Sequence, residues 1–523
     1  MTSISRTTNV LSGRPMAASP LIRAQTRPLL GVAIVLGIML VAITAMVSGW
    51  IWIAFAAFCV VAFYPVARAL ATQTPIDPFE PVYVFAGTMA ITFGIKGLWV
   101  MTVKSDLWGT GPILRYPDLR RWVTEAFLLS AIGLVLFYFG YYGKWGKRLG
   151  KRVPLGREIT TGSRLWFAVL LAFSIGTFSI GLMFYRLGGI RAVLAAPFQI
   201  WFGAGQSWGM VGNYFLLPLV AFSSTGWALL YVGTIRRRGP LTYLALFAGF
   251  AAITAFYTVL SAKSGFLQCL LWVMVCRHYL IKRIRLRHIA GLALLTALLS
   301  PVLYTYRTYG ADPRLIWQTA VATVKNPVGM GDLLLVRFPD LEGFATIIGY
   351  VRRPKDLWYG RTFEDIVFYW IPRAWWPGKP MSSFMQVNQK IFPLAYASGY
   401  PDTYSLTGEL YLDFWIFGVL GFFVVGLLLR ALHEHYLGGQ RTLRGALLYS
   451  VAVLYIFQLA SGGVTGVLFN WMCDFLPALL LVWIASSGSK IQRRLPHVDA
   501  NSAYSNDVSD GRPSGPRLPV RPS

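Results

Sequence analysis

The chain has 523 residues, of which 55% are hydrophobic and only 13% are charged, and its formal net charge is +27. An excess of bases this large is often the mark of a nucleic-acid-binding protein, but here the bases are divided among short loops between apolar runs, which excludes nucleic acid as the expected partner. The apolar runs are about 17 to 25 residues long, which matches the hydrocarbon thickness of a bilayer. The composition therefore predicts an all-α polytopic membrane protein.

Hydropathy predicts about twelve transmembrane helices in one membrane domain. The first run is not a cleavable signal peptide, because a long leader with several arginines precedes it and no small-residue cleavage pattern follows it. No internal repeat or inverted half is visible. The predicted spans are 29–46, 50–66, 81–101, 123–142, 165–185, 210–235, 241–262, 265–281, 289–306, 412–429, 446–460 and 464–484.

Basic residues set the predicted orientation, since loops rich in Lys and Arg stay in the cytoplasm. With both termini inside, the dense basic segments 144–164, 236–238, 282–287 and 430–444 all fall on the cytoplasmic side. A leader, 1–28, and a Pro-, Ser- and Gly-rich tail, 487–523, are predicted to be cytoplasmic and disordered. Spans one to nine then occupy 29–306, and spans ten to twelve occupy 411–486.

Residues 307–410 form the one long segment that cannot cross a bilayer, and the charge pattern places it outside the membrane, on the side opposite the cytoplasm. It holds nine of the 21 acidic residues and no histidine. Apolar residues at helical spacing over 330–350 predict a helix lying at the membrane interface. Three tryptophans and several prolines follow, which favours a loop that stays close to the lipid headgroups.

Cationic side chains in this loop are the first candidates for binding an anion. Guanidinium groups pair well with phosphate oxygens, and the diphosphate of a lipid carrier is such an anion at the membrane surface. Contacts with lipid headgroups or with nearby acids are the alternative interpretation. The candidate diphosphate or glycan ligands are Arg307, Arg337, Arg361, Arg373 and Lys379, together with Lys263, which lies at the outer end between the predicted spans 241–262 and 265–281.

Two acids at the end of the loop are candidates for the general base that a sugar hydroxyl needs. Glu409 and Asp413 are four residues apart, so a helix would place both on one face. The alternative is an ordinary favourable interaction of acids with a helix N-terminus. Within the spans, Lys96 and Asp474 need a partner or a cavity, because an isolated charge in the membrane is costly.

Other kinds of chemistry lack a sequence signal. The four cysteines lie in or beside spans without CxxC spacing, and His433 and His435 have no obvious third ligand, so neither a disulfide framework nor a metal site is expected. No phosphate-binding loop or nucleophile elbow occurs. We therefore expect no cofactor and a substrate that arrives already activated on a lipid.

An ordered series of short motifs resembles the bacterial O-antigen and exopolysaccharide repeat-unit polymerases of the Wzy type. The motifs are Arg337-Phe-Pro-Asp-Leu341, Tyr359-Gly-Arg-Thr-Phe363, Ile371-Pro-Arg-Ala-Trp-Trp-Pro-Gly-Lys-Pro380, Thr407-Gly-Glu-Leu-Tyr-Leu-Asp-Phe414 and Gly418-Val-Leu-Gly421. The resemblance covers about a third of the chain.

This resemblance implies a GT-C-like membrane glycosyltransferase that moves a growing glycan from undecaprenyl diphosphate onto another lipid-linked repeat unit, outside the bacterial inner membrane. It implies that 307–410 is a large periplasmic loop, that membrane lipids are partners and that a chain-length regulator can assist, and that Arg337 and Arg373 are ligands of the diphosphate or glycan. Lys263 stands where relatives often have Arg, which keeps the charge but loses the planar fork. The base is not identified by any motif, so Glu409 and Asp413 depend on position alone.

Three other functions stay open at this stage. An O-antigen ligase shares the lipid-linked donor and the large loop but is expected to use a periplasmic histidine, and none is predicted outside here. A flippase or polysaccharide transporter would be expected to carry charges along its spans. A structural component of an envelope assembly is the third.

Overall fold

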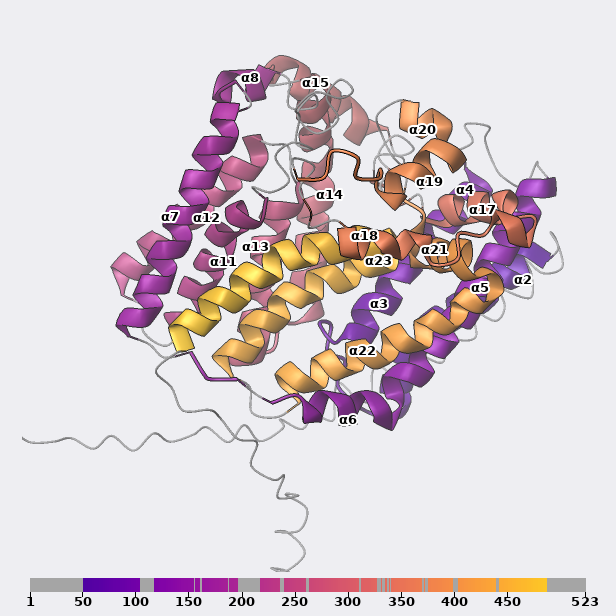
Figure 1. The fold of residues 1–523 in the computed structure, drawn as a ribbon, viewed down its shortest axis with the longest axis horizontal. Coiled ribbons are helices and arrows are strands. Elements are labelled where there is room, and N and C mark those ends of the chain that lie inside the picture. Colours follow the sequence, from indigo (N-terminus) through magenta and orange to yellow (C-terminus); the bar gives the residue numbers. More distant parts are fainter. Residues whose placement is uncertain are drawn as a thin grey trace, which may run out of the picture.

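The computed structural model describes residues 50–103, 117–154, 156–159, 162–186, 188–195, 217–235, 239–259, 263–309, 312–326, 331, 334–335, 338, 340–368, 371, 375–397, 403–438 and 442–486. Every regular element in these ranges is a helix (Figure 1). The predicted first span, 29–46, lies outside the described residues, as do the leader and the tail.

The long helices in the first half of the chain coincide with predicted spans, whereas two short helices, Lys144–Arg152 and Ile190–Ala195, lie between those spans. A short stretch of π-helix, η1 (Ala90–Ile95), lies between α3 and α4. The helices of this half are α2 (Trp50–Ala71), α3 (Pro81–Met89), α4 (Lys96–Thr102), α5 (Pro117–Tyr142), α6 (Lys144–Arg152), α7 (Ser163–Arg186), α8 (Ile190–Ala195), α11 (Leu217–Gly233), α12 (Pro240–Val259), α13 (Lys263–Leu280) and α14 (Leu286–Tyr309).

The second half mixes short helices with three longer ones. In order, these are α15 (Pro313–Lys325), α17 (Asp340–Tyr350), η5 (Pro354–Asp356), η6 (Arg361–Phe363), α18 (Glu364–Phe368), α19 (Ser383–Ile391), α20 (Pro393–Ala397), α21 (Ser405–Phe414), η7 (Trp415–Val419), α22 (Leu420–Leu437) and α23 (Leu443–Ser486).

Eight helical segments of the described residues are long and apolar enough to cross a membrane, which supports a polytopic membrane protein. They are Trp50–Ala71, Pro81–Thr102, Asp118–Tyr142, Ser163–Arg186, Pro240–Val259, Leu286–Leu303, Ser405–Leu437 and Leu443–Leu468. Three shorter apolar helices, Leu219–Gly233, Leu267–Leu280 and Asn470–Ser486, coincide with further predicted spans.

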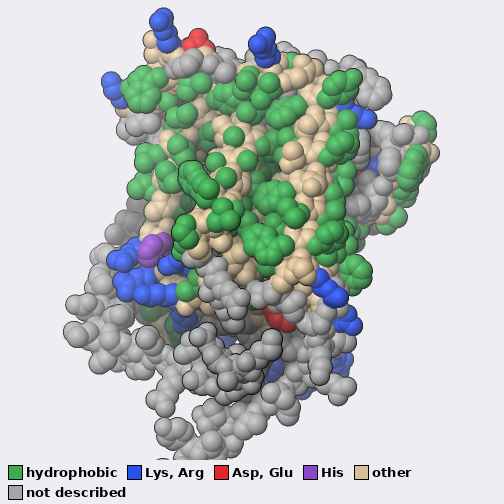
Figure 2. All heavy atoms as spheres, turned by 90° about the vertical axis from the view of Figure 1, so that its left-hand side faces the viewer, with side chains coloured by type: hydrophobic (Ala, Val, Ile, Leu, Met, Phe, Trp, Pro, Cys, Tyr) green, Lys and Arg blue, Asp and Glu red, His purple; other side chains and the backbone are tan. Residues whose placement is uncertain are grey.

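An apolar belt covers one side of the molecule, between two layers that carry basic side chains (Figure 2). Helices α7, α12 and α14 all carry exposed apolar side chains, among them Phe178, Phe247 and Leu294. A soluble protein rarely exposes a continuous apolar surface of this kind, whereas a bilayer would cover it. The belt therefore fits the hydrocarbon layer.

The two ends of the bundle differ in kind. The basic helix α6 lies across one end, close to the C-terminal end of α22, whereas α15, α19 and α20 lie at the other end (Figure 1). We call these the α6 end and the distal end. Gly146 and Gly150 of α6 pack directly against α22. A Cβ atom at Gly146 would collide with Arg430, and one at Gly150 would collide with the backbone of Ala431. The predicted cytoplasmic basic segment and the predicted periplasmic loop are thus at opposite ends.

Helix α23 is a helical hairpin. Gly463 has φ 76° and ψ 179°, which interrupts the helix, and the hydroxyl of Tyr455 donates to the carboxylate of Asp474 across the two limbs. On a straight helix these residues would be about 28 Å apart. The chain therefore folds back at Gly463, in agreement with two predicted spans, 446–460 and 464–484 (Figure 1).

Two predictions for the second half need correction. The predicted interfacial helix, 330–350, corresponds mainly to α17, which begins only at Asp340. Nearly all residues of α17 from Asp340 to Gly349 are buried, because the helix packs against α5 and α21. The predicted span 412–429 lies within the apolar segment Ser405–Leu437, but the chain turns sharply at Trp415 (φ 54°), and the long helix α22 starts only at Leu420. For α17, contacts with distant helices outweigh the local apolar periodicity.

Candidate functional site

Helix α21 lies at the centre of the distal end and carries both acids that the sequence indicated. It packs against α17 on one side and α23 on another. Glu409 and Asp413 are one turn apart and both are completely buried. Such acids need strong hydrogen-bond donors, because burying a carboxylate without partners costs several kcal/mol. They find those donors in two different segments.

Glu409 binds the tip of the α23 hairpin. Its carboxylate accepts hydrogen bonds from the backbone N–H of Val464, from the N–H of Thr465 at 3.2 Å and from the Thr465 hydroxyl. These amides begin the second limb, where the helix dipole favours a negative charge. Glu409 therefore caps a helix that belongs to another part of the chain.

Asp413 binds the loop that contains Arg361. Its Oδ1 accepts from the N–H of Gly360 at 3.1 Å and of Thr362 at 3.4 Å, and its Oδ2 accepts from the Thr362 hydroxyl. Close by, the Trp358 N–H donates to the Leu412 carbonyl at 3.0 Å. The loop around Arg361 is thus fixed to α21 by both side-chain and backbone bonds.

A second buried charged group joins α17 to the first half of the chain. Lys96, at the end of the π-helical stretch, lies 3.3 Å from the Glu342 carboxylate, and neither side chain is exposed. This pair gives the charge at Lys96 the partner that its predicted membrane position requires. The sequence could not identify that partner, since 246 residues separate the two.

Asp340 lies at the start of the same helix and is also fully buried. Its Oδ1 accepts from Thr403 Oγ1 at 3.4 Å, whereas Oδ2 accepts no hydrogen bond from the described residues. Burial raises the pKa of the Asp340 carboxyl well above its usual range, against smaller opposing effects of the Thr403 hydroxyl and the Lys96 charge. Asp340 is therefore a proton-holding group next to the Lys96–Glu342 pair.

The remaining predicted ligands are distributed more widely. Arg361 is exposed on its loop, and Lys379 donates to the Ile371 carbonyl at 3.0 Å, which ties together a segment rich in Trp and Pro. Arg337 and Arg373 lie outside the described residues. Lys263 and Arg307 belong to the helices α13 and α14, but their side chains are also outside the description. The structure thus brings Glu409, Asp413 and Arg361 together and does not test the others.

Asp365 adds one more acid at this end. It accepts from the Ser383 N–H at 2.7 Å and from the Ser383 hydroxyl at 2.6 Å, which joins α18 to α19. Burial raises the pKa of the Asp365 carboxyl, and the hydrogen bonds from Ser383 oppose that rise. Like Asp413, it connects two segments of the distal end.

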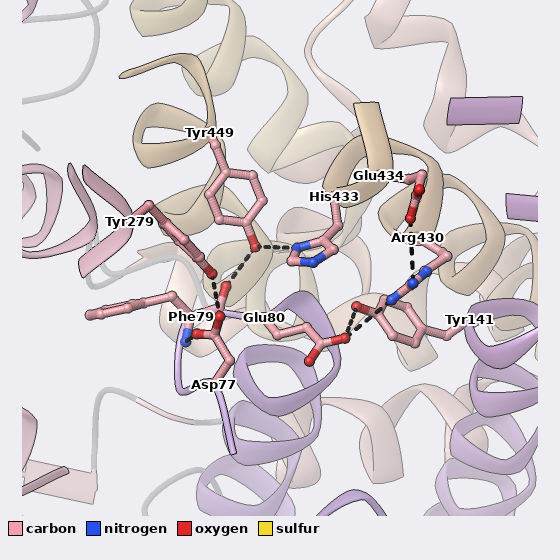
Figure 3. A network of polar contacts seen from close by, with 9 residues as sticks. All are labelled: Asp77, Phe79, Glu80, Tyr141, Tyr279, Arg430, His433, Glu434 and Tyr449. Atoms are coloured by element: carbon pink, nitrogen blue, oxygen red, sulfur yellow. Dashed lines mark hydrogen bonds and ion pairs between the residues drawn. The ribbon is translucent and has the colours of Figure 1, made fainter. Parts of the chain in front are cut away.

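A separate polar network closes the α6 end (Figure 3). Glu80 accepts from the Tyr141 hydroxyl at 2.9 Å and from Arg430 at 3.2 Å, and Arg430 also contacts Glu434 at 3.4 Å. These residues come from α5, from α22 and from the loop before α3. The network therefore joins helix ends that hydropathy alone could not have paired.

The other half of the network centres on Asp77. It accepts from Tyr279 at 2.9 Å and lies 3.3 Å from His278 Nε2. His278 Nδ1 accepts the Ile284 N–H at 3.1 Å, so the ring proton is on Nε2 and points to the carboxylate. Burial alone would raise the pKa of Asp77, but the hydrogen bonds with His278, Phe79 and Tyr279 lower it below its usual range.

Tyr449 completes the link between these helices. Its hydroxyl donates to the Phe79 carbonyl at 2.6 Å, so His433 Nδ1, at 3.3 Å, is the donor in its contact with that hydroxyl. Two histidines thus belong to this network: His433, which contacts Tyr449 (Figure 3), and His278, which contacts Asp77.

Two further observations concern the kind of site. Among the described residues, no three His, Cys, Asp or Glu side chains gather as a metal site. The cysteines at 59, 269, 276 and 473 are free thiols that are buried or half-buried, as expected for packing residues.

No family model, curated protein or solved structure matches the chain. The functional argument therefore rests on the residues of the distal end.

Proposed function

We propose that the protein polymerises oligosaccharide repeat units carried on a polyprenyl diphosphate, in the inner membrane of a bacterium and at its periplasmic face. The observation that carries the proposal is a convergence at the distal end. The segments Tyr359–Phe363 and 407–414 are two of the motifs that resemble repeat-unit polymerases, and Asp413 bonds one to the other. The next motif, Gly418 to Gly421, packs on Leu410 of α21.

In the proposed reaction, the bond between the anomeric carbon of the growing glycan and the diphosphate oxygen breaks. The diphosphate leaves with the electron pair, still attached to its lipid, and cationic side chains stabilise its charge. A sugar hydroxyl of the second repeat unit forms the new bond to the anomeric carbon. Its proton passes to a base, for which Glu409 and Asp413 are the predicted candidates.

The hydrogen bonds of the two acids favour a structural role for Glu409 and Asp413 and leave substrate binding to the basic residues. Each carboxylate is buried, and its oxygens already accept several hydrogen bonds from the protein. Both acids are therefore better suited to hold the hairpin tip and the Arg361 loop than to leave those donors for a substrate. The basic loop residues, with Arg373 first, stay the predicted ligands of the diphosphate.

Deletion of the gene tests the proposal directly. The expected phenotype is loss of polymer, with single repeat units left on the lipid carrier, and a full-length copy should restore the long chains. The Arg373→Ala variant should insert normally into the membrane but make no polymer. Chains of normal length in the deletion strain would overturn the proposed function, and chains of normal length in the variant would remove Arg373 from the site.

A transporter of lipid-linked glycans is the second candidate. It is favoured by the sharp helix breaks at Trp415 and Gly463, since discontinuous helices form many transport sites. The two candidates differ in where the substrate accumulates. Loss of a polymerase leaves lipid-linked units exposed at the periplasmic face, where an added glycosidase cleaves them in spheroplasts, whereas loss of a transporter leaves them protected inside.

A further inference from the structure

Helix α6 is a short basic helix that lies beside the end of a membrane span (Figure 1). It follows the apolar segment Asp118–Tyr142, from which Gly143, with φ −63° and ψ 158°, separates it. Its glycines pack against α22 at Arg430 and Ala431, near the C-terminal end of that helix. Since the apolar segment that contains α22 ends at Leu437, α6 lies at the depth where the hydrocarbon layer gives way to lipid headgroups.

The side chains of α6 form rows along the helix, because residues four apart lie on nearly the same face. Gly146 and Gly150 form the row that contacts α22. Trp145 and Leu149 form the neighbouring row, and these side chains are 69% and 40% exposed. The face of α6 that the protein covers is the glycine row, so the apolar row beside it is left for a partner outside the chain.

The five bases of α6 divide between two sides of the helix. Lys147 and Lys151 lie one turn apart on the far side of the glycine row. The Lys151 ammonium group is 3.9 Å from the Glu434 carboxylate, and the charge of Lys147 acts on Glu80. These two bases therefore have acids of the protein itself as counter-charges.

The other three bases form a row next to the apolar one. They are Lys144, Arg148 and Arg152, and we call them the outer bases. All three are exposed, and within the described part of the chain no salt bridge involves any of them. No acid occurs between Lys144 and Arg152. An apolar row bordered by bases is typical of a helix that lies in the plane of an anionic membrane surface.

The chemistry of these two rows favours a phospholipid over an acidic protein. Indole rings prefer the headgroup level of a bilayer, guanidinium groups bind phosphate oxygens, and basic segments next to a span attract anionic lipids. The orientation of the chain in the membrane explains the bases at this end. It does not explain an exposed tryptophan and leucine among them, whereas a lipid that is apolar on one side and anionic on the other does.

We propose that α6 is a binding site for an anionic phospholipid of the membrane leaflet at the α6 end. Trp145 and Leu149 lie against the glycerol and the upper acyl chains, and the outer bases contact the phosphate. The lipid covers the apolar row and supplies the counter-charge that the outer bases lack. This inference goes beyond the proposed function and does not depend on it, because it concerns the opposite end of the bundle.

Lipid binding to the delipidated full-length protein in detergent, measured by native mass spectrometry, tests the proposal. The probes are dioleoyl phosphatidylglycerol and dioleoyl phosphatidylcholine, which share their acyl chains and their phosphate but differ in net charge. The parent protein should bind the first phosphatidylglycerol about tenfold more tightly than the first phosphatidylcholine, because several bases act on one anionic headgroup.

Three variants locate the site. The preference for phosphatidylglycerol should disappear when the outer bases are neutralised together, by Lys144→Gln, Arg148→Gln and Arg152→Gln. The matched control removes the same charge from exposed bases elsewhere and should keep the preference; it combines Arg352→Gln, Arg353→Gln and Lys355→Gln. Trp145→Ser should weaken both lipids by about the same factor, because the ring contacts a part that the two lipids share. All three variants change exposed side chains, so without lipid they should melt at the parent temperature.

The proposal fails if the parent protein binds the two lipids equally well, or if the variant without the outer bases keeps the parent's preference. It also fails if both triple variants lose the preference to the same extent, since the effect would then follow the net charge of the protein and not this surface. The gene deletion tests the polymerase separately, and its outcome leaves the lipid site unaffected.

Discussion

Gly463 at the tip of the α23 hairpin gives the sharpest test of how the distal end is built. Its φ of 76° and ψ of 179° fall in a region that is essentially restricted to glycine. A Cβ added there would collide with Glu409 Oε2 and lie 3.1 Å from Glu409 Cδ. Gly463→Ala therefore strains the backbone and pushes the carboxylate away from the Val464 and Thr465 amides.

The size of the effect follows from these two costs. The backbone conformation costs about 1–3 kcal/mol for a residue with a side chain. Loss of one charge-assisted hydrogen bond adds about 1.5–3 kcal/mol. The sum, about 2.5–6 kcal/mol, is a large part of the net stability of a typical protein. We therefore expect Gly463→Ala to lower the melting temperature by several degrees or to prevent folding.

Fluorescence-detected size-exclusion chromatography after heating, on a fluorescent fusion in detergent, measures this effect. Gly462→Ala is the matched control, because its Cβ would stand 3.5 Å from Val467 Cγ2, an ordinary contact. In a Glu409→Ala background the collision disappears, so Gly463→Ala should cost less there. Equal melting temperatures for the Gly462 and Gly463 variants would refute the reasoning.

Two further predictions concern the buried charges of α17. Lys96→Met alone should destabilise the protein by about 3–5 kcal/mol, because it leaves Glu342 buried without its cation, and Lys96→Met with Glu342→Met should recover most of the loss. A double variant no more stable than the single one would contradict this. For Asp340, the raised pKa means that stability is fully present below the unfolded pKa, about 3.9, and is lost as pH rises through the folded pKa. Melting curves between pH 4.5 and 8 should show Asp340→Asn gaining over the parent as pH rises, and a constant difference would exclude the titration of Asp340 as the cause.

The acids of the distal end show how far sequence reasoning reaches. The spacing of Glu409 and Asp413 correctly placed both on one helix, and the charge of Lys96 correctly required a partner. The sequence could not predict which residues these partners are. Glu409 binds Val464 and Thr465, which are 55 and 56 positions away, and Asp413 binds Thr362, which is 51 positions away. Such contacts depend on how helices pack, which local periodicity does not encode.

The interfacial helix predicted at 330–350 failed for a related reason. An apolar stripe between charged residues is equally suited to a lipid surface and to a protein interior. The stripe is the same in both cases, but α17 places its acids, Asp340 and Glu342, inside the protein, where Lys96 provides a counter-charge.

The sequence by itself determined that this chain is a helical membrane protein, because long apolar runs and the asymmetric placement of bases depend only on local composition. It also located the reversal at Gly463 between two spans. Only the tertiary structure decided what meets at the distal end: Glu409 at the hairpin tip, Asp413 beneath the Arg361 loop, and Lys96 beside α17. The physical reason is that a buried charge is tolerable only where packing supplies its partner, and that partner can come from any part of the chain.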